Sequence, residues 1–149
     1  MDRRADLMDD PDIKLLRRAY RAFETRDLGE LERIADPEIQ VSTVTGVLAG
    51  RSEPYRGRRE IEQYLGDLAE TWDEIELTPQ RFYRLAGERL LVFGRVRARR
   101  GNRLVDAPNA WLWSLGDGQI CSVNVFGDLQ EAWSLLEQEA GRAASDLSA

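Results

Sequence analysis

Apolar and polar residues alternate through the second half of the chain, and this alternation predicts four consecutive β-strands. Between Ile75 and Phe126 most apolar side chains recur at every second position, as in a sheet with one buried face. The segments between the strands, at residues 86–88, 101–102 and 116–118, are short, contain glycine and suit hairpin turns. The pattern therefore predicts an antiparallel meander.

The same alternation assigns each strand residue to a face, and the apolar sets are expected to form a concave face against the helices. On the third strand it places Asn109, Trp111 and Trp113 inward and Asp106 outward. Asn109 is the one clearly polar side chain on the inward face of that strand. The other residues predicted to share the inward faces are Ile75, Leu77, Arg81, Tyr83, Leu85, Leu90, Val92, Gly94, Val96, Ala98, Val105, Ala107, Leu115, Cys121, Val123 and Val125.

Helical periodicity marks the first half of the chain. Ile13, Leu16, Tyr20 and Phe23 recur at three- and four-residue steps, which predicts a helix with Pro11 in its first turn and Tyr20 buried. A short helix, a strand, a loop, a second long helix and a last helix are then predicted through residues 31–34, 39–43, 44–54, 57–72 and 128–136. Three parts are expected in all: a loose arm over 1–10, one domain over 11–140 and a frayed tail over 141–149.

Composition narrows the possible partners. At 149 residues and 17.0 kDa the chain fits one domain, and its net charge of −6 with a pI near 4.8 argues against nucleic acid. A basic cluster of Arg95, Arg97, Arg99, Arg100 and Arg103 is interpreted as a solvated outer sheet face.

The cysteine and histidine counts limit the disulfides, metal sites and general bases that the chain can form. A single cysteine, Cys121, excludes an internal disulfide, and the charged N-terminus lacks the apolar stretch of a signal peptide, so a cytoplasmic protein is expected. No apolar run is long enough to span a bilayer, so no membrane partner is expected. The chain contains no histidine, which removes the commonest metal ligand and general base. Neither a metal nor a cofactor is expected.

Four local motifs follow one another along the chain: Ala22-Phe23 with Asp27-Leu28, Asp36-Pro37-Glu38-Ile39, Tyr55-Arg56-Gly57, and Gly118-Gln119-Ile120 leading to Phe126-Gly127-Asp128. Their order resembles the SnoaL-like polyketide cyclase branch of the nuclear transport factor 2-like superfamily, which includes ketosteroid isomerases and limonene epoxide hydrolases. The resemblance implies an α+β fold in which a cone-shaped, curved antiparallel or mixed sheet wraps around about three helices. It also implies a pocket between helices and sheet, and often a homodimer through the outer sheet face.

The catalytic residues of that superfamily are not matched here. The isomerases need a carboxylate base on the first strand, where this chain has Ser42 or Thr43. The cyclases use an acid on the last strand and a histidine on the third, where this chain offers Val125 or Asn124, and Trp111. The sequence therefore contains no intact catalytic set of these two kinds.

A ligand site is expected between the helices and the inward sheet face. Tyr20 and Asn109 are candidate polar anchors, because a buried amide or hydroxyl needs a partner. Asn109 is equally open to a structural role, bonded to Tyr20, to backbone or to a buried water. Trp111 and Trp72 are about equally open to core packing, and core packing is the favoured interpretation of Trp113. The predicted ligand-binding residues are Tyr20, Asn109, Trp111, Trp72, Tyr55, Tyr83 and Val125.

Three functions stay open at this point. The first is a binding protein for an apolar or aromatic small molecule, and the second is an isomerase, cyclase or hydrolase with Tyr20 and Asn109 as oxyanion donors and Glu53 as base. For a hydrolase the chain offers Arg97 and Asp106, which the alternation places outward. The third is an interaction module that buries its outer sheet face against a second copy or another protein, through Phe93, Leu112, Ile120 and Phe126.

Overall fold

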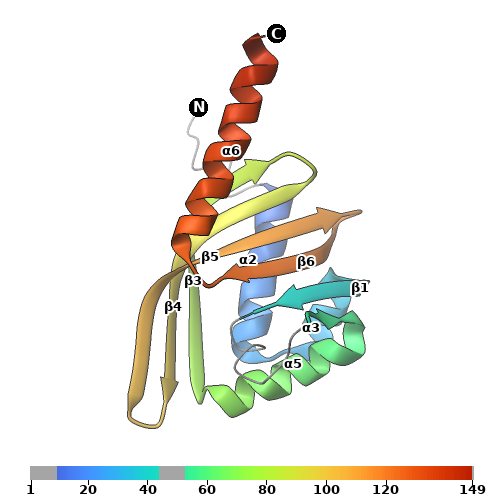
Figure 1. Ribbon diagram of the computed structural model, residues 1–149. Coiled ribbons are helices and arrows are strands. Elements are labelled where there is room, and N and C mark those ends of the chain that lie inside the picture. Colours follow the sequence, from blue (N-terminus) through green and yellow to red (C-terminus); the bar gives the residue numbers. More distant parts are fainter. Residues whose placement is uncertain (1–9, 44–52, 149) are drawn as a thin grey trace.

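The computed structural model describes residues 10–43 and 53–148, with side chains through residue 140 (Figure 1). The helices are α2 (Pro11–Thr25), α3 (Leu28–Ile34), α5 (Gly57–Thr71) and α6 (Leu129–Ser148). The strands are β1 (Ala35–Ser42), β2 (Tyr55–Arg56), β3 (Glu74–Leu85), β4 (Arg89–Arg100), β5 (Arg103–Gly116) and β6 (Gln119–Phe126). Residues 1–9 of the predicted arm and 44–52 of the predicted loop lie outside the described residues.

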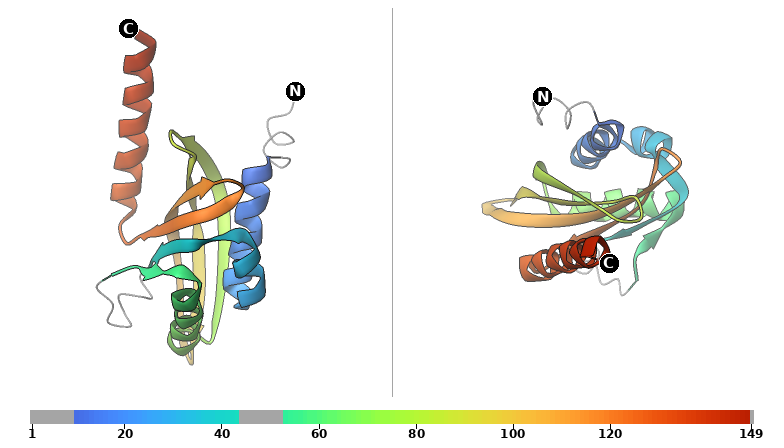
Figure 2. Two further views of the ribbon diagram at one scale, coloured as in Figure 1. Left: turned by 90° about the vertical axis from the view of Figure 1, so that its right-hand side faces the viewer. Right: turned by 90° about the horizontal axis from the view of Figure 1, so that it is seen from above.

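The described strands form one sheet in the order β2-β1-β6-β5-β4-β3. β1 runs parallel to β6, and the other neighbouring strands are antiparallel. Figure 2 shows α2 and α3 on one side of the curved sheet and α6 on the opposite side. Residues of α2, α3 and α5 share one core with the inner sheet face. The α+β fold predicted from the sequence is confirmed, with a mixed sheet that curves around three helices and stays open.

The first helix begins and ends where its sequence dictates. The Asp10 carboxylate accepts a hydrogen bond from the backbone N–H of Asp12 at 2.8 Å, and Pro11 occupies the first turn, where its missing N–H costs nothing. Arg26 ends the helix in the left-handed conformation, with φ 56° and ψ 42°. One stripe of the helix is buried against the sheet, as predicted: Ile13, Leu16, Ala19, Tyr20, Ala22 and Phe23.

A bulge in β3 changes which side chains face inward. The pairing of β3 with β4 shifts between Pro79 and Arg81, because proline has no N–H to give to the ladder. Before the bulge Ile75 and Leu77 pack on the inner core, as predicted. After it the alternation reverses, so that Phe82 packs inward. Tyr83 lies with the outer apolar cluster, and its predicted inward position was wrong.

A second bulge has the same effect on β6. Ser114 pairs with Ser122, whereas Leu115 pairs with Ile120, so Cys121 is the extra residue. Ile120 is therefore buried in the inner core, with 1% of its surface exposed. The prediction that Cys121 faces inward and Ile120 outward was wrong, because one extra residue flips every side chain that precedes it along the strand. Beyond the bulge, Val125 keeps its predicted inward position.

The outer sheet face has a second, smaller core, which α6 covers. Leu91, Phe93 and Ala110 contribute to it from the sheet, and Ala132 from α6. The ring of Trp133 stacks on Phe93, with centroids 4.4 Å apart and planes 26° apart. The chain thus buries apolar residues on both sides of its sheet.

The last helix is longer than the sequence indicated. It continues through Ser148, past the boundary predicted at residue 140, with Gly141 inside it. A glycine in a helix costs about 1 kcal/mol relative to alanine, and the three alanines at 140, 143 and 144 favour the helix around it. None of the described helices is both long and apolar enough to cross a membrane.

Two glycines give a matched test of the fold. A Cβ on Gly94 of β4 would lie 2.0 Å from the carbonyl oxygen of Thr78 on β3, whereas a Cβ on Gly66 of α5 meets nothing within 4 Å. We expect Gly94→Ala to lower the free energy of unfolding by about 1–3 kcal/mol, because backbone must move. Gly66→Ala is expected to raise it by up to about 1 kcal/mol through helix propensity. Urea denaturation measures both, and a neutral Gly94→Ala variant would contradict the close approach of β3 and β4.

Candidate functional site

A cavity of about 210 Å³ lies between the helices and the concave face of the sheet. Helices α2 and α5 form one side, and strands β1, β3, β4, β5 and β6 form the other. None of the described residues that line it carries a charge. They are Tyr20, Phe23, Val41, Thr43, Tyr64, Leu68, Trp72, Ile75, Leu77, Val96, Val105, Ala107, Pro108, Asn109, Trp111, Trp113, Val123 and Val125.

Tyr20 joins α2 to the sheet at the wall of this cavity. The indole N–H of Trp113 donates a hydrogen bond to the Tyr20 hydroxyl at 3.0 Å. The Tyr20 ring meets both Trp111 and Trp113 edge to face, with centroids 5.1 Å apart in each pair. The Tyr20 oxygen is thus the acceptor in this bond. No described residue accepts a hydrogen bond from the Tyr20 hydroxyl, so its proton is available to a molecule in the cavity.

The tyrosines of the cavity stay protonated at neutral pH. Burial raises the pKa of Tyr20 well above its usual value, and the hydrogen bond from Trp113 offsets this only in part. Burial likewise raises the pKa of Tyr64 to about 12, although a hydrogen bond with Thr43 opposes the shift. Both phenols therefore act as neutral hydrogen-bonding groups, and neither can serve as a base near pH 7.

Asn109 lies half-buried on the inner face of β5, directly opposite Gly94 on β4. Its side chain lines the cavity and forms no hydrogen bond with another described residue. Asp106 lies on the outer face and pairs there with Arg95 at 3.0 Å. The strand parity predicted from the sequence is confirmed, and the Asn109 amide offers the cavity both a donor and an acceptor.

The other predicted site residues divide between the cavity and the rest of the core. Trp72, Trp111 and Val125 line the cavity. Tyr55 does not: it is 1% exposed in the inner core, and its hydroxyl donates to Asp67 at 2.5 Å. Tyr83 lies on the opposite side of the sheet, edge to face with Phe93, and its predicted place at the pocket rim was wrong because of the β3 bulge.

Tyr64 and Thr43 are polar cavity residues that were not among the predicted ligand-binding residues. Tyr64 lies on the buried stripe of α5, and the sequence analysis named Thr43 only as a position where the isomerase carboxylate is missing. A tyrosine on a buried stripe needs a partner for its hydroxyl, and this need was the signal that could have found the pair.

Hydrogen bonds of Asp73 with Arg99, Gly101 and Arg26, here called the polar clamp, hold the chain just after α5 beside the cavity. The backbone N–H of Asp73 donates to the carbonyl of Arg99, and the Asp73 carboxylate accepts from the N–H of Gly101, both at 2.8 Å. The Gly101 N–H holds the pKa of the Asp73 carboxyl below its usual value. Arg26 donates to the Asp73 carbonyl at 3.0 Å. Trp72, the residue between α5 and this clamp, is therefore held against the cavity.

Within the described ranges 10–43 and 53–140, the candidate acid, base and hydrolase residues do not line this cavity. No described carboxylate lines it, Glu53 is exposed, and residues 44–52 include no Asp or Glu in their sequence. Arg97 and Asp106, the residue types of a hydrolase, are both exposed on the outer face. Among the described residues, no group of three or more potential metal ligands is found.

The architecture, with a cavity between the helices and the curved sheet, is the nuclear transport factor 2-like fold. An NTF2-like protein of unknown function from Burkholderia pseudomallei superposes with a TM-score of 0.69 at 22% identity, over 82% of this chain and 94% of that one. The crystal structure of TerC, co-crystallised with polyporic acid, superposes with a TM-score of 0.70 at 19% identity, over 86% and 99% of the two chains.

The chain belongs to the SnoaL-like domain family, whose model matches residues 16–123. Uncharacterised proteins of Mycobacterium tuberculosis and Mycobacterium bovis are 29% identical to it over 123 residues, which span 80% of this chain and 91% of each relative. The family resemblance inferred from the local motifs is thereby confirmed.

The raised tyrosine pKa values predict a loss of stability in alkali. Below pH 10 Tyr64 is protonated in both the folded and unfolded states, and above it the unfolded chain loses the proton first. Between pH 10 and about 12 Tyr64 alone should lower the free energy of unfolding by roughly 2–3 kcal/mol. Urea denaturation across this range, with Tyr64→Phe as the comparison, tests it. If the free energy of unfolding falls equally with pH in the unmodified protein and in Tyr64→Phe, the burial of the Tyr64 phenol is contradicted.

Proposed function

We propose that this protein binds an uncharged, largely apolar aromatic small molecule in the cavity between α2, α5 and the sheet. The observation that carries the proposal is the chemistry of the lining. It has no charged side chain among the described residues, yet it offers the hydroxyl proton of Tyr20 and the amide of Asn109. Natural binding sites combine apolar walls with a few such orienting polar groups.

The walls favour a flat ligand. Trp72 and Trp111 line the cavity from α5 and from β5, and aromatic faces of this kind stack on planar rings. A chain of the same fold was crystallised with polyporic acid, which is consistent with small-molecule binding. The ligand of the present chain is inferred from its own lining, because likeness at 19% identity concerns the fold alone.

The lining also disfavours an anionic ligand. Moving an ionised carboxylate from water into an apolar cavity costs several kcal/mol unless a positive charge or several hydrogen bonds compensate it. Among the residues that the structure describes, no Lys or Arg lines the cavity. A neutral ketone, ether or phenol can instead accept from Tyr20 or Asn109 without this cost.

Catalysis is the weaker candidate. Tyr20 and Asn109 could together stabilise a developing oxyanion, but proton transfer needs a base within hydrogen-bond reach. The described lining supplies none, and the two tyrosines stay protonated. The homodimer and the cytoplasmic location inferred from the sequence stay predictions.

Three ligands of nearly equal shape test the proposal. 2-Acetylnaphthalene carries a neutral acceptor, 2-isopropenylnaphthalene lacks it, and 2-naphthoate carries a charge in its place. We expect the ketone to bind about three- to tenfold more tightly than the hydrocarbon, as one net hydrogen bond allows. The carboxylate should bind at least about a hundredfold more weakly than the ketone at neutral pH. Tryptophan fluorescence and calorimetry report the affinities, and failure of all three to bind would refute the proposal.

A matched pair of variants locates the ligand. Asn109→Leu should remove most of the preference for the ketone over the hydrocarbon, because it deletes the amide and keeps the bulk. Asn124→Leu makes the same change on β6 at an exposed position outside the cavity lining, so it should leave both affinities unchanged. Equal effects of the two substitutions would contradict a hydrogen bond between the Asn109 amide and the ligand.

A further inference from the structure

The cavity opens along one edge of β5. The exposed fraction of the inward side chains of this strand rises from 1% at Trp113 and 4% at Trp111 to 42% at Val105. Pro108 also lines the cavity, although it is exposed and belongs to the alternate, outward set of side chains. A cavity that touches both sets of one strand reaches the edge of that strand. The mouth of the cavity is therefore bordered by the edge of β5.

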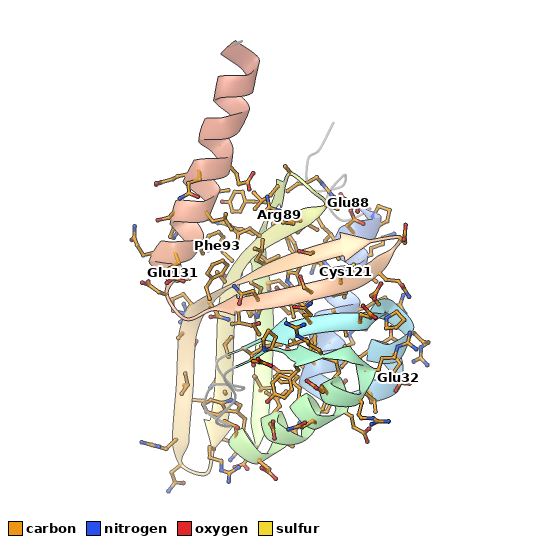
Figure 3. All side chains as sticks on the ribbon, turned by 45° about the vertical axis from the view of Figure 1, so that its right-hand side comes forward. Glu32, Glu88, Arg89, Phe93, Cys121 and Glu131 are labelled. Carbon is orange, nitrogen blue, oxygen red and sulfur yellow. The ribbon has the colours of Figure 1, made fainter. Side chains whose placement is uncertain are left out.

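This edge has no neighbouring strand among the described residues. β6 ends at Phe126, which lies opposite Ala110, so residues 103–109 of β5 pair only with β4. In Figure 3 the hairpin of β4 and β5 extends at the lower left past the end of β6. Leu104 and Val105 lie on this stretch, and they are two of the three large apolar residues exposed in the described part of the chain. An exposed edge of this kind can accept a further strand.

The hairpin turn fixes which backbone groups of β5 face β4. Two residues, 101 and 102, connect the strands, so Arg100 and Arg103 lie directly opposite each other and close the turn with their backbone hydrogen bonds. The residues of β5 that bond to β4 are therefore every second one from Arg103 to Asn109. The N–H and C=O groups of the residues between them point to the free edge.

Leu104, Asp106 and Pro108 are the residues whose backbone groups point to this edge. Within the described ranges no hydrogen bond of the Leu104 or Asp106 N–H is found. Pro108 has no N–H, yet it pairs with Arg95 in regular register, as expected where the missing N–H would face away from β4. The free edge thus offers two N–H donors and the three carbonyls of these residues beside the mouth of the cavity.

We propose that the ligand of this site is an extended peptide that carries an aromatic side chain. Its backbone adds a strand to the free edge of β5, and its aromatic ring enters the cavity beside Asn109. The inference rests on the proposed function, since the ring takes the place of the aromatic small molecule. A second copy of this chain paired through the same edge would bring no aromatic side chain to the cavity, because residues 103–109 contain none.

The side chains around the edge define the peptide further. In an added strand, one set of side chains lies on the same face as Val105 and Ala107, over the mouth of the cavity, and the alternate set lies beside Leu104. Arg103 and Asp106 are the charged residues of the stretch 103–109, and they carry opposite charges. Asp106 also pairs with Arg95 at 3.0 Å. The edge therefore favours an uncharged peptide with apolar or β-branched residues on either side of the aromatic one.

Backbone methylation tests the added strand. The probe is the uncharged peptide acetyl-Thr-Val-X-Val-Thr-amide, in which X is 2-naphthylalanine. In an added strand alternate N–H groups face β5, so an N-methyl group on X and one on the valine after it should differ in effect. One should weaken binding at least about tenfold, because it removes a hydrogen bond and blocks the approach of the strands, and the other less than about twofold. Tryptophan fluorescence measures both, and equal effects would overturn the proposal.

A matched pair of variants places the added strand on β5. Asp106→Pro removes an N–H that faces the edge, whereas Asp106→Ala removes the same carboxylate and keeps this N–H. The peptide should bind Asp106→Pro about three- to tenfold more weakly than Asp106→Ala. 2-Acetylnaphthalene, which forms no strand, should bind the two variants equally. Equal affinities of the peptide for both variants would contradict pairing at this edge, and the methylation test stands even if Asp106→Pro does not fold.

Comparison of ligands separates this inference from the proposed function. The peptide should bind the unmodified protein about tenfold or more tightly than acetyl-2-naphthylalanine amide, which carries the same ring with almost no backbone. If 2-acetylnaphthalene binds in the cavity and the peptide gains nothing over this amide, the added strand is refuted and the aromatic site stands. If none of the three binds, the proposed function is refuted as well.

Discussion

The hydrogen bond between the Trp113 indole and the Tyr20 hydroxyl is the interaction on which the inner half of the molecule depends. Trp113 is 1% exposed, and a buried indole N–H without a partner would cost about 1–3 kcal/mol. Among the described residues its partner is Tyr20, on the buried stripe of α2. The bond therefore fixes where the first helix crosses the sheet, and with it the depth of the cavity.

The same bond decides what the cavity can recognise. Because the Tyr20 oxygen already accepts from Trp113, its proton is the group left for a ligand. Burial keeps this phenol and that of Tyr64 protonated, and the described part of the lining supplies no charge to balance an anion. A site of this kind orients a neutral acceptor between aromatic walls, which is the chemistry of binding more than of proton transfer.

The two sides of the sheet have different tasks. On the inner side three helices share the core and two of them, α2 and α5, line the cavity, whereas on the outer side α6 packs against part of the sheet. The positions of Asn109 and Asp106 on opposite faces of β5 separate these tasks within one strand.

Strand alternation predicted the faces of β4 and β5 because their pairing is regular from end to end. It failed for Tyr83, which follows a bulge in β3, and for Ile120, which precedes one in β6, because one extra residue reverses the faces on one side of each bulge. Pro79 was a sequence signal for the bulge in β3, but the sequence of β6 contains no comparable signal for its bulge. The hydrogen bond from Tyr55 to Asp67 could not be predicted from the sequence either, because it depends on how α5 packs in the fold.

The most direct test of the central claim is a crystal structure of the protein with 2-acetylnaphthalene. The account predicts density for the fused rings between Trp72 and Trp111, with the carbonyl oxygen within hydrogen-bond distance of the Tyr20 hydroxyl or the Asn109 amide. A ligand bound outside the cavity would contradict the account. So would a cavity filled by side chains in a protein that still binds the ligand in solution.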